Sequence, residues 1–348
     1  MSIKYGITFH PSWWHKNAGI DFVQEFFDDP AYRIDCDLKM RKCLYDRFGS
    51  FGIGEENPSP RPLLGSDFLA AGYLQSELLG CEIKYEPDNS PQVISMGLNP
   101  GEIGRIKAAD LDISPVWART QKQIDWLLEK YGRVESYVNL MGIQNIAMDI
   151  MGQGLFLAYY TDEDAVRGLL GEIYKTVLAA GKRFKALTSD VSGGVTAIIR
   201  DVMPQCYLTS NCSVEMISND QYEDFLLEHD QALADEFGCF GIHHCGGTME
   251  HVTEGYRKVR GLAFAEVGAG SDLAAVRQAM PDMMLNARYS PAKLLTETEQ
   301  QIRAKVQALC EAGRDYKDRG LISISCVGID SNVPYESICT FLSACSEL

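Results

Sequence analysis

The sequence lacks a long apolar run and a surplus of positive charge. No stretch approaches the ~18 consecutive apolar residues of a membrane helix, and the longest candidates, such as 152–160, are interrupted by Gly and Gln. The net charge of −16 argues against nucleic acid or an anionic membrane surface as a partner. The first nine residues show no charged segment followed by a long apolar one, so we expect no secretory signal.

Two glycine-rich phosphate-binding motifs are also missing. No G-x-G-x-x-G follows the first expected strand, and no G-x-x-x-x-G-K-[ST] occurs anywhere. These absences argue against a dinucleotide-binding fold and a P-loop. The eleven cysteines are not expected to form disulfides, because a chain of this size without a leader is better explained by reduced thiols in the cytoplasm.

Strands and helices alternate along most of the chain, which predicts a parallel sheet. Expected strands include 4–9, 185–190, 238–245, 262–267 and 321–326, most of them followed by a helical segment. About eight such units favour an α/β fold of the (β/α)8 TIM barrel type. We expect one barrel domain over residues 1–348, with an N-terminal elaboration and a β-hairpin insertion around 82–98.

Three side chains at expected strand ends predict a metal site. His243 and Cys245 are two positions apart, so on a strand they project to the same side. Cys326 ends another apolar strand, and the carboxyl ends of all barrel strands lie at one mouth. One imidazole and two thiolates are typical zinc ligands, and three protein ligands leave one position open. His244 points the other way and is expected to support or pack.

A second unusual segment follows the first strand and reads His10-Pro11-Ser12-Trp13-Trp14-His15. Trp13 and Trp14 suit either an aromatic floor for a ligand, including a quaternary ammonium, or a lid that packs on the core. The sequence leaves both interpretations open, and His10 shares them.

Several motifs in the second half resemble one known superfamily. They are the segment 243–247 (His-His-Cys-Gly-Gly), 265–268 (Ala-Glu-Val-Gly), 283–291 (Met-Met-Leu-Asn-Ala-Arg-Tyr-Ser-Pro), 326–329 (Cys-Val-Gly-Ile) and 333–336 (Val-Pro-Tyr-Glu). From about residue 162 onward the chain resembles the uroporphyrinogen decarboxylase superfamily, and the first half does so only loosely. The resemblance implies a (β/α)8 barrel.

Within this superfamily the chain is more similar to the cobalamin-dependent methyltransferases. Decarboxylases carry an arginine motif after the first strand, and the corresponding segment 9–15 has none. The methyltransferase motif, H-x-C followed seventy to eighty residues later by a lone Cys, matches His243, Cys245 and Cys326. The resemblance implies zinc, a methylcobalamin-carrying corrinoid protein as partner, and a thiol acceptor of the coenzyme M or homocysteine type.

The other readings are a decarboxylase, a methyltransferase with a methylated amine, aryl ether or folate substrate, and a zinc-free barrel that serves as partner of a corrinoid protein. Asp190 and Glu266 are candidates for a fourth zinc ligand or a substrate contact, and Asn286 and Tyr289 for substrate contacts. Turn formation and packing remain equal interpretations for these four residues.

Overall fold

The computed structural model describes residues 3–188, 194–315, 317 and 319–348, and these form a (β/α)8 barrel. Its strands are β1 (Lys4–Phe9), β2 (Leu63–Gly65), β5 (Glu135–Tyr137), β6 (Tyr207–Ser210), β7 (Phe240–His244), β8 (Leu262–Val267), β9 (Met284–Tyr289) and β10 (Ile322–Ile329). The TIM-barrel prediction is therefore confirmed.

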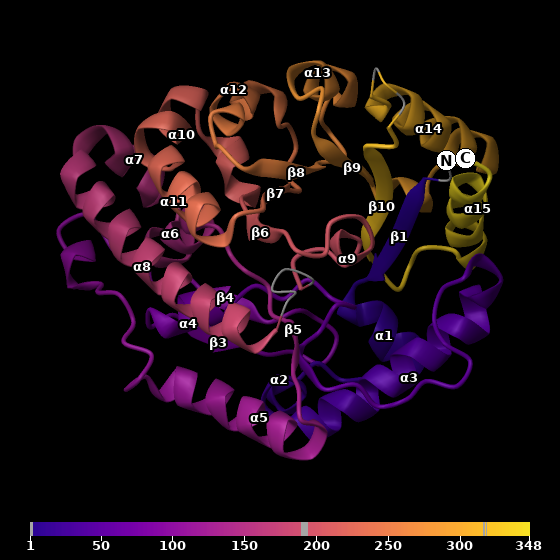
Figure 1. The fold of residues 1–348 in the computed structure, drawn as a ribbon, viewed down its shortest axis with the longest axis horizontal. Coiled ribbons are helices and arrows are strands. Elements are labelled where there is room, and N and C mark those ends of the chain that lie inside the picture. Colours follow the sequence, from indigo (N-terminus) through magenta and orange to yellow (C-terminus); the bar gives the residue numbers. More distant parts are fainter. Residues whose placement is uncertain (1–2, 189–193, 316, 318) are drawn as a thin grey trace.

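The strands follow one another around the ring in chain order. Six of them form a parallel sheet in the order β1-β10-β9-β8-β7-β6, and β2 pairs in parallel with β5. A parallel bridge between Met141 and Ser210 joins the chain beyond β5 to β6. The first strand thus lies beside the last, with Lys4 opposite Ser323 (Figure 1).

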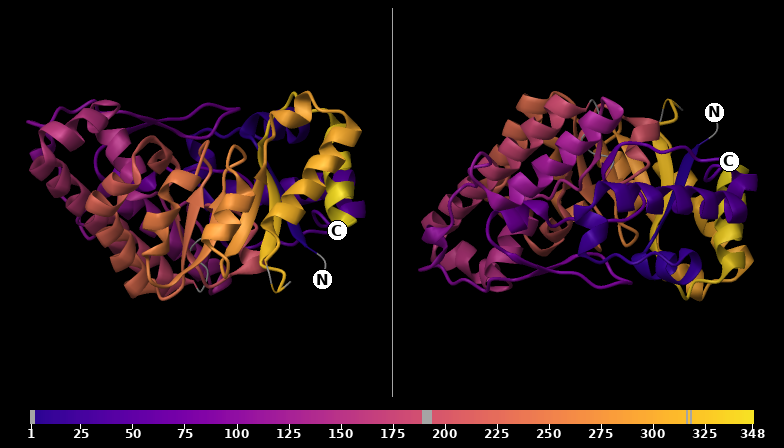
Figure 2. Two further views of the ribbon diagram at one scale, coloured as in Figure 1. Left: turned by 90° about the horizontal axis from the view of Figure 1, so that it is seen from above. Right: turned by 90° about the horizontal axis from the view of Figure 1, so that it is seen from below.

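Helices surround the strands on their outer side (Figures 1 and 2). The α-helices are α1 (Pro11–Ala18), α2 (Gln24–Asp28), α3 (Pro30–Phe48), α4 (Leu74–Leu78), α5 (Pro115–Tyr131), α6 (Ile143–Met151), α7 (Gly154–Thr161), α8 (Glu163–Leu187), α9 (Ile199–Val202), α10 (Asn219–Phe225), α11 (Leu227–Phe237), α12 (Thr253–Arg257), α13 (Leu273–Ala279), α14 (Glu299–Gly313) and α15 (Tyr335–Ser346). Short 3-10 turns are η1 (Gly49–Phe51), η2 (Ile103–Arg105), η3 (Cys212–Met216), η4 (Glu250–Val252) and η5 (Lys293–Leu295).

Local sequence signals explain where several helices begin. Asp29 accepts hydrogen bonds from the backbone N–H groups of Ala31 and Tyr32, and Pro30 occupies the first position of α3. Thr298 and Gln301 form a capping box at the start of α14. These contacts satisfy N–H groups that have no partner inside the helix, so each helix start is fixed by its own residues.

The register of the sheet decides which side chains share a face. His243 lies opposite Glu266, Glu266 opposite Asn286, and Asn286 opposite Ser323. Paired residues on neighbouring strands project to the same side, and the side changes with each step along a strand. These four side chains therefore form one row on one face of the sheet.

One expectation about the strands is corrected. The strand expected at 185–190 is not present, because α8 continues to Leu187 and keeps Phe184 buried on its inner face. Residues 189–193, including Asp190, lie outside the described part of the chain. The fourth barrel strand is instead β6, whose four residues are all buried.

The hairpin expected around 82–98 is present. Strands β3 (Glu82–Lys84) and β4 (Gln92–Ile94) pair antiparallel, with Ile83 opposite Val93. It forms a separate two-stranded sheet, and within the described residues neither strand pairs with a barrel strand.

The segment that contains α9, between α8 and β6, lies against the first three strands of the barrel, β1, β2 and β5. Ile198 approaches Gly6 of β1, and Arg200 forms an ion pair with Asp67, which follows β2. The guanidinium of Arg200 also lies 5.0 Å from the ring centroid of Tyr137, at the end of β5. The segment containing α9 therefore packs against β1, β2 and β5 (Figure 1).

No helix within the described residues is both long and apolar enough to cross a lipid bilayer.

Candidate metal centre

Three side chains of types that can bind a metal ion converge at the ends of two neighbouring strands. Cys212 begins η3 just after β6, His243 lies in β7, and Cys245 follows β7 directly. Their candidate ligand atoms all lie within 4.8 Å of one another. His243 is buried, Cys212 is half-buried and Cys245 is exposed, so the group is anchored in the protein and can be reached from solvent.

Hydrogen bonds fix the chain on both sides of Cys212. The Asn145 side chain, on α6, donates to the carbonyl of Ser210 (2.7 Å) and accepts from the backbone N–H of Ser213 (2.9 Å). The backbone N–H of Asn211 donates to the carbonyl of His243 (2.8 Å). The Asn211 amide in turn donates to the buried Asp230 (2.9 Å). Cys212 is thus tied both to α6 and to the neighbouring strand.

The imidazole of His243 is oriented by a buried carboxylate. Its Nδ1 is hydrogen-bonded to Glu266 Oε2, and Arg288 Nη1 donates to the other oxygen, Glu266 Oε1, at 2.7 Å. Burial works against a charge on Glu266, but His243 and Arg288 together lower its pKa to about 2. With Nδ1 held in this way, Nε2 is the nitrogen left to bind a metal ion, as in many metal-bound histidines.

The two thiols of the group are in direct contact. The sulfurs of Cys212 and Cys245 lie 2.8 Å apart. The hydrogen bond between them lowers the pKa of Cys212 well below its usual value, and the same bond together with burial raises the pKa of Cys245. The contact therefore favours one thiolate and one thiol over two protonated thiols.

This donor set fits zinc. One imidazole nitrogen and two sulfurs are ligands that zinc prefers, and three protein ligands leave a fourth position open. Sulfurs bound to one tetrahedral zinc ion at about 2.3 Å lie roughly 3.8 Å apart. The thiols of Cys212 and Cys245 must therefore separate by about 1 Å when such an ion binds.

Cys326, predicted as the third ligand, is not part of this group. It lies three residues beyond Ser323, which shares the row of His243 and Glu266, so Cys326 projects to the other face. It pairs in register with Tyr289, whose ring contacts Phe341 of α15. Burial raises the pKa of the Cys326 thiol to about 12, which keeps it protonated. In the structure Cys212 occupies the place that the sequence assigns to Cys326.

The other expected contacts at strand ends have separate surroundings. Asn286 shares the row of His243, but its amide donates to Ser325 (2.8 Å) and accepts from Ser323 (3.1 Å). The Tyr289 hydroxyl donates to Glu297, on the outer side of the sheet. Of the three, Glu266 alone contacts the candidate metal centre, where it positions His243 and is not itself one of the candidate ligands.

The aromatic segment after β1 packs into the core. Trp13 and Trp14 are only 4% and 0% exposed. Their rings pack on Phe9 and on each other, with the Phe9 and Trp13 centroids 3.8 Å apart. His10 caps α1 by accepting a hydrogen bond from the backbone N–H of Ser12. Of the two interpretations left open for this segment, the contacts match packing on the core.

His244 has the supporting role expected for it. Its Nδ1 is hydrogen-bonded to the hydroxyl of Tyr256 (2.9 Å), and its Nε2 to the carbonyl of Thr248 (2.9 Å). Both ring nitrogens are therefore occupied by the loop and helix that follow β7.

Sequence reasoning missed Cys212, Arg288 and Asn145. One signal in the sequence indicates Cys212, since Cys206 and Cys212 precede Cys239 and Cys245 by the same 33 positions. Equal offsets place both cysteine pairs side by side if 207–210 and 240–244 are neighbouring parallel strands, which they are. For Asn145 and Arg288 the sequence offers no comparable signal.

Comparisons with known proteins agree with the barrel. No curated protein matches the sequence. A solved methyltransferase from Methanosarcina mazei shares the fold with a TM-score of 0.66 at 16% identity, and the match covers 99% of this chain and 94% of that one. A B12-independent methionine synthase from Shewanella sp. W3-18-1 matches with a TM-score of 0.46 at 11% identity, over 99% and 96% of the two chains. The family model described as Uroporphyrinogen decarboxylase (URO-D) matches residues 71–348, and the chain belongs to that family.

Proposed function

We propose that this protein is a zinc-dependent methyltransferase that moves a methyl group between a corrinoid protein and a thiol. One observation carries the proposal, namely the group of Cys212, His243 and Cys245 at the ends of β6 and β7. Ligand sites of (β/α)8 barrels lie at this carboxyl end of the strands. One solved structure that shares the fold is a methyltransferase from Methanosarcina mazei, which agrees with this class.

The donor set suits activation of a sulfur nucleophile. A free thiol has a pKa near 8.5 and is mostly protonated at neutral pH. Zinc bound at this site would supply an open coordination position at which a substrate thiol loses its proton. Two sulfur ligands leave the ion electron-rich, which favours a reactive thiolate over polarisation of a carbonyl group. The thiol acceptor we propose is of the coenzyme M or homocysteine type.

The chain's own residues have distinct tasks in this proposal. Glu266 and Arg288 hold the His243 ring in one orientation. Asn145 holds the backbone on both sides of Cys212, so this sulfur starts from a fixed position. Cys245 is exposed, so a thiol and a methylated corrinoid can approach from solvent. Because these thiols must stay reduced, we place the protein in the cytoplasm.

The overall reaction balances as a transfer between two atoms. A sulfur–carbon bond forms, the cobalt–carbon bond breaks, and its electron pair remains on cobalt while the thiol proton leaves to solvent. The methyl donor is therefore a methylated corrinoid carried by a partner protein. Loss of the methyl group leaves the reduced corrinoid on that partner.

Two measurements test the proposal together. We expect one zinc per chain in the purified protein, and growth of the cob(I)alamin absorbance when methylcobalamin and coenzyme M or homocysteine are added. Protein that retains no zinc after incubation with it, and releases carbon dioxide from a porphyrinogen, would instead be a decarboxylase. Zinc binding with turnover only of a methylated amine, aryl ether or folate would keep the metal and change the substrate.

A further inference from the structure

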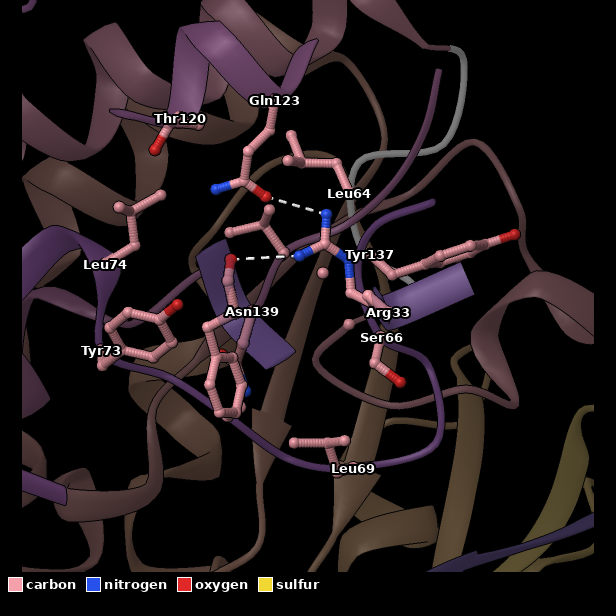
Figure 3. A pocket seen from close by; sticks show the side chains of 15 residues that line it. Arg33, Leu64, Ser66, Leu69, Tyr73, Leu74, Thr120, Gln123, Tyr137 and Asn139 are labelled. Atoms are coloured by element: carbon pink, nitrogen blue, oxygen red, sulfur yellow. Dashed lines mark hydrogen bonds between the residues drawn. The ribbon is translucent and has the colours of Figure 1, made fainter. Parts of the chain in front are cut away.

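A cavity lies apart from the three candidate metal ligands, where β2 and β5 end against α3 and α5. The space in it that admits water-sized molecules is about 50 Å³, and the cavity opens partly to solvent. Leu69, Leu74 and Phe27 give it apolar walls, and its polar lining includes Arg33, Gln123 and Asn139 (Figure 3). None of the three candidate metal ligands lines it.

The charge beside this cavity is a buried guanidinium without a carboxylate. Arg33 is 1% exposed, and its hydrogen bonds go to the carbonyl oxygens of Phe26, Phe27 and Leu63 and to Gln123 Oε1. Among the described residues no acidic side chain forms an ion pair with it. Buried charges in proteins are normally paired, so a positive potential remains at this wall of the cavity.

Arg33 also fixes the direction of a neighbouring amide. Its Nη2 donates to Gln123 Oε1 at 2.8 Å, so the oxygen of this amide faces the guanidinium. The Nε2 group of Gln123 then points away from Arg33 (Figure 3). Within the described part of the chain it has no hydrogen-bond partner. A group that accepts hydrogen bonds is therefore favoured beside Gln123, in the field of Arg33.

A third polar group of the lining has an unsatisfied acceptor. Asn139 is 8% exposed, and its Oδ1 is buried without a hydrogen-bond partner among the described residues. Buried polar atoms in folded proteins nearly always have a partner, and one left without is unfavourable. A ligand that donates a hydrogen bond to this oxygen would remove that penalty.

We propose that this cavity binds a short-chain hydroxy acid. The carboxylate lies beside Gln123 and Arg33, the hydroxyl donates to Asn139, and the carbon chain contacts Leu69, Leu74 and Phe27. A hydroxyl is favoured over an ammonium group as the donor, because a second cation would be repelled by Arg33. This site does not depend on the candidate metal centre, so the proposal holds whatever reaction that centre catalyses.

Calorimetric titration with 3-hydroxybutyrate, butyrate and 1,3-butanediol tests the three parts of the proposal. Wild-type protein is expected to bind 3-hydroxybutyrate saturably, butyrate roughly 2–10-fold more weakly for want of the hydrogen bond to Asn139, and the diol not at all. Absence of saturable binding of either acid up to about 50 mM overturns the proposal.

The decisive variant is Gln123→Glu. It supplies Arg33 with a carboxylate and replaces the donor that faces the cavity, so we expect acid binding to weaken by more than about 10-fold and the melting temperature without ligand to rise. Gln300→Glu makes the same chemical change at an exposed position of α14 and should leave affinity unchanged. Undiminished acid binding to a folded Gln123→Glu protein contradicts the proposal.

A second variant, Asn139→Ala, tests the proposal independently if Gln123→Glu does not fold. In Asn139→Ala the hydroxyl loses its acceptor, so 3-hydroxybutyrate and butyrate should bind equally. A preference for the hydroxy acid that survives this substitution shows that Asn139 does not recognise it, and the assignment then fails.

Discussion

Cys212 and Cys245 are separated by 33 positions in the sequence, yet their sulfurs lie 2.8 Å apart. This contact exists because β6 and β7 are neighbouring parallel strands in register, with Ser210 opposite His243. Two thiols and an imidazole come together at one point of the barrel rim, and the first prediction concerns which cysteine completes the group.

Cysteine substitutions separate the two possible ligand sets. We expect Cys212→Ser and Cys245→Ser to lose the bound zinc and Cys326→Ser to retain it, because only Cys212 and Cys245 lie in the group with His243. Zinc per chain is measured by elemental analysis after dialysis. Loss of zinc from Cys326→Ser with retention in Cys212→Ser would restore the ligand set implied by the sequence resemblance.

Replacing the carboxylate behind His243 should weaken metal binding. Glu266→Gln removes the charge that orients the imidazole, and changes of this kind usually reduce metal affinity about 10–100-fold. Competition with a chromophoric chelator measures the affinity. The matched control is Glu254→Gln, an exposed residue paired with Arg257, which should bind metal as the wild type does. Unchanged affinity in a folded Glu266→Gln protein would limit Glu266 to a structural role.

Asp230 should make the wild-type protein more stable in mild acid than at neutral pH. Burial raises its pKa from 3.8 to about 6, although Tyr222 and Asn211 donate hydrogen bonds that favour its charged form. The folded state therefore binds the proton more tightly than the unfolded state, so this contribution is present at low pH and is lost as pH rises to about 6.

Asp230→Asn tests this linkage. The variant should gain roughly 1–3 kcal/mol at pH 7 relative to the wild type, and the difference should shrink toward pH 4. Urea unfolding at several pH values measures both free energies. Comparison with the wild type isolates Asp230 from Asp149, whose pKa is also raised to about 6 by burial. A difference independent of pH would contradict the assignment.

Asp67 is expected to be essential for stability because it joins two cations. Arg61 Nη2 lies 2.8 Å from its Oδ1, Arg200 pairs with its other oxygen, and the carboxylate is buried. Removing one partner of a buried pair typically costs 3–5 kcal/mol, so Asp67→Asn should unfold at markedly lower urea concentration. Asp46→Asn breaks the exposed pair with Lys42 and should change stability by about 0.5 kcal/mol or less.

Trp14 provides a test of the packing interpretation for the segment after β1. Its ring is fully buried among Phe9, Trp13 and Phe68. Trp14→Ala should lose roughly 3–5 kcal/mol of unfolding free energy. Trp14→Phe keeps an aromatic ring in the core and should lose less. Equal stability of Trp14→Ala and the wild type would show that the ring does not contribute to the core.

The sequence predicts the barrel and one of the two strands that lead into the candidate metal centre, because both predictions rest on periodicity. His243 and Cys245 are found together because an i, i+2 spacing survives small errors in strand boundaries. Cys326 is different, since its side depends on the register of β10, and one position exchanges the two faces of a sheet. Ser323 and Ser325, not Cys326, contact Asn286 in the row of His243.

The strand that precedes Cys212 escapes detection because β6 is short and wholly buried. Its residues Tyr207–Ser210 show no alternation of apolar and polar side chains, so the period of a strand is absent. The segment 185–187 is expected from the sequence to be a strand, but its residues continue the pattern of the preceding helix α8. The hydrogen bonds of Asn145 and Arg288 depend on tertiary contacts between distant segments, which no local pattern reveals.

The pairing of β1 with β10 also constrains the order in which the protein can fold. Lys4 meets Ser323 and Ile7 meets Cys326, so these contacts join segments more than 300 positions apart. Such distant pairings are slow to form, because the chain between them must be closed first. During synthesis β1 has no β10 to pair with until nearly the whole chain has left the ribosome. A nascent chain stalled before residue 322 would expose that strand edge, a site at which partially made copies can associate.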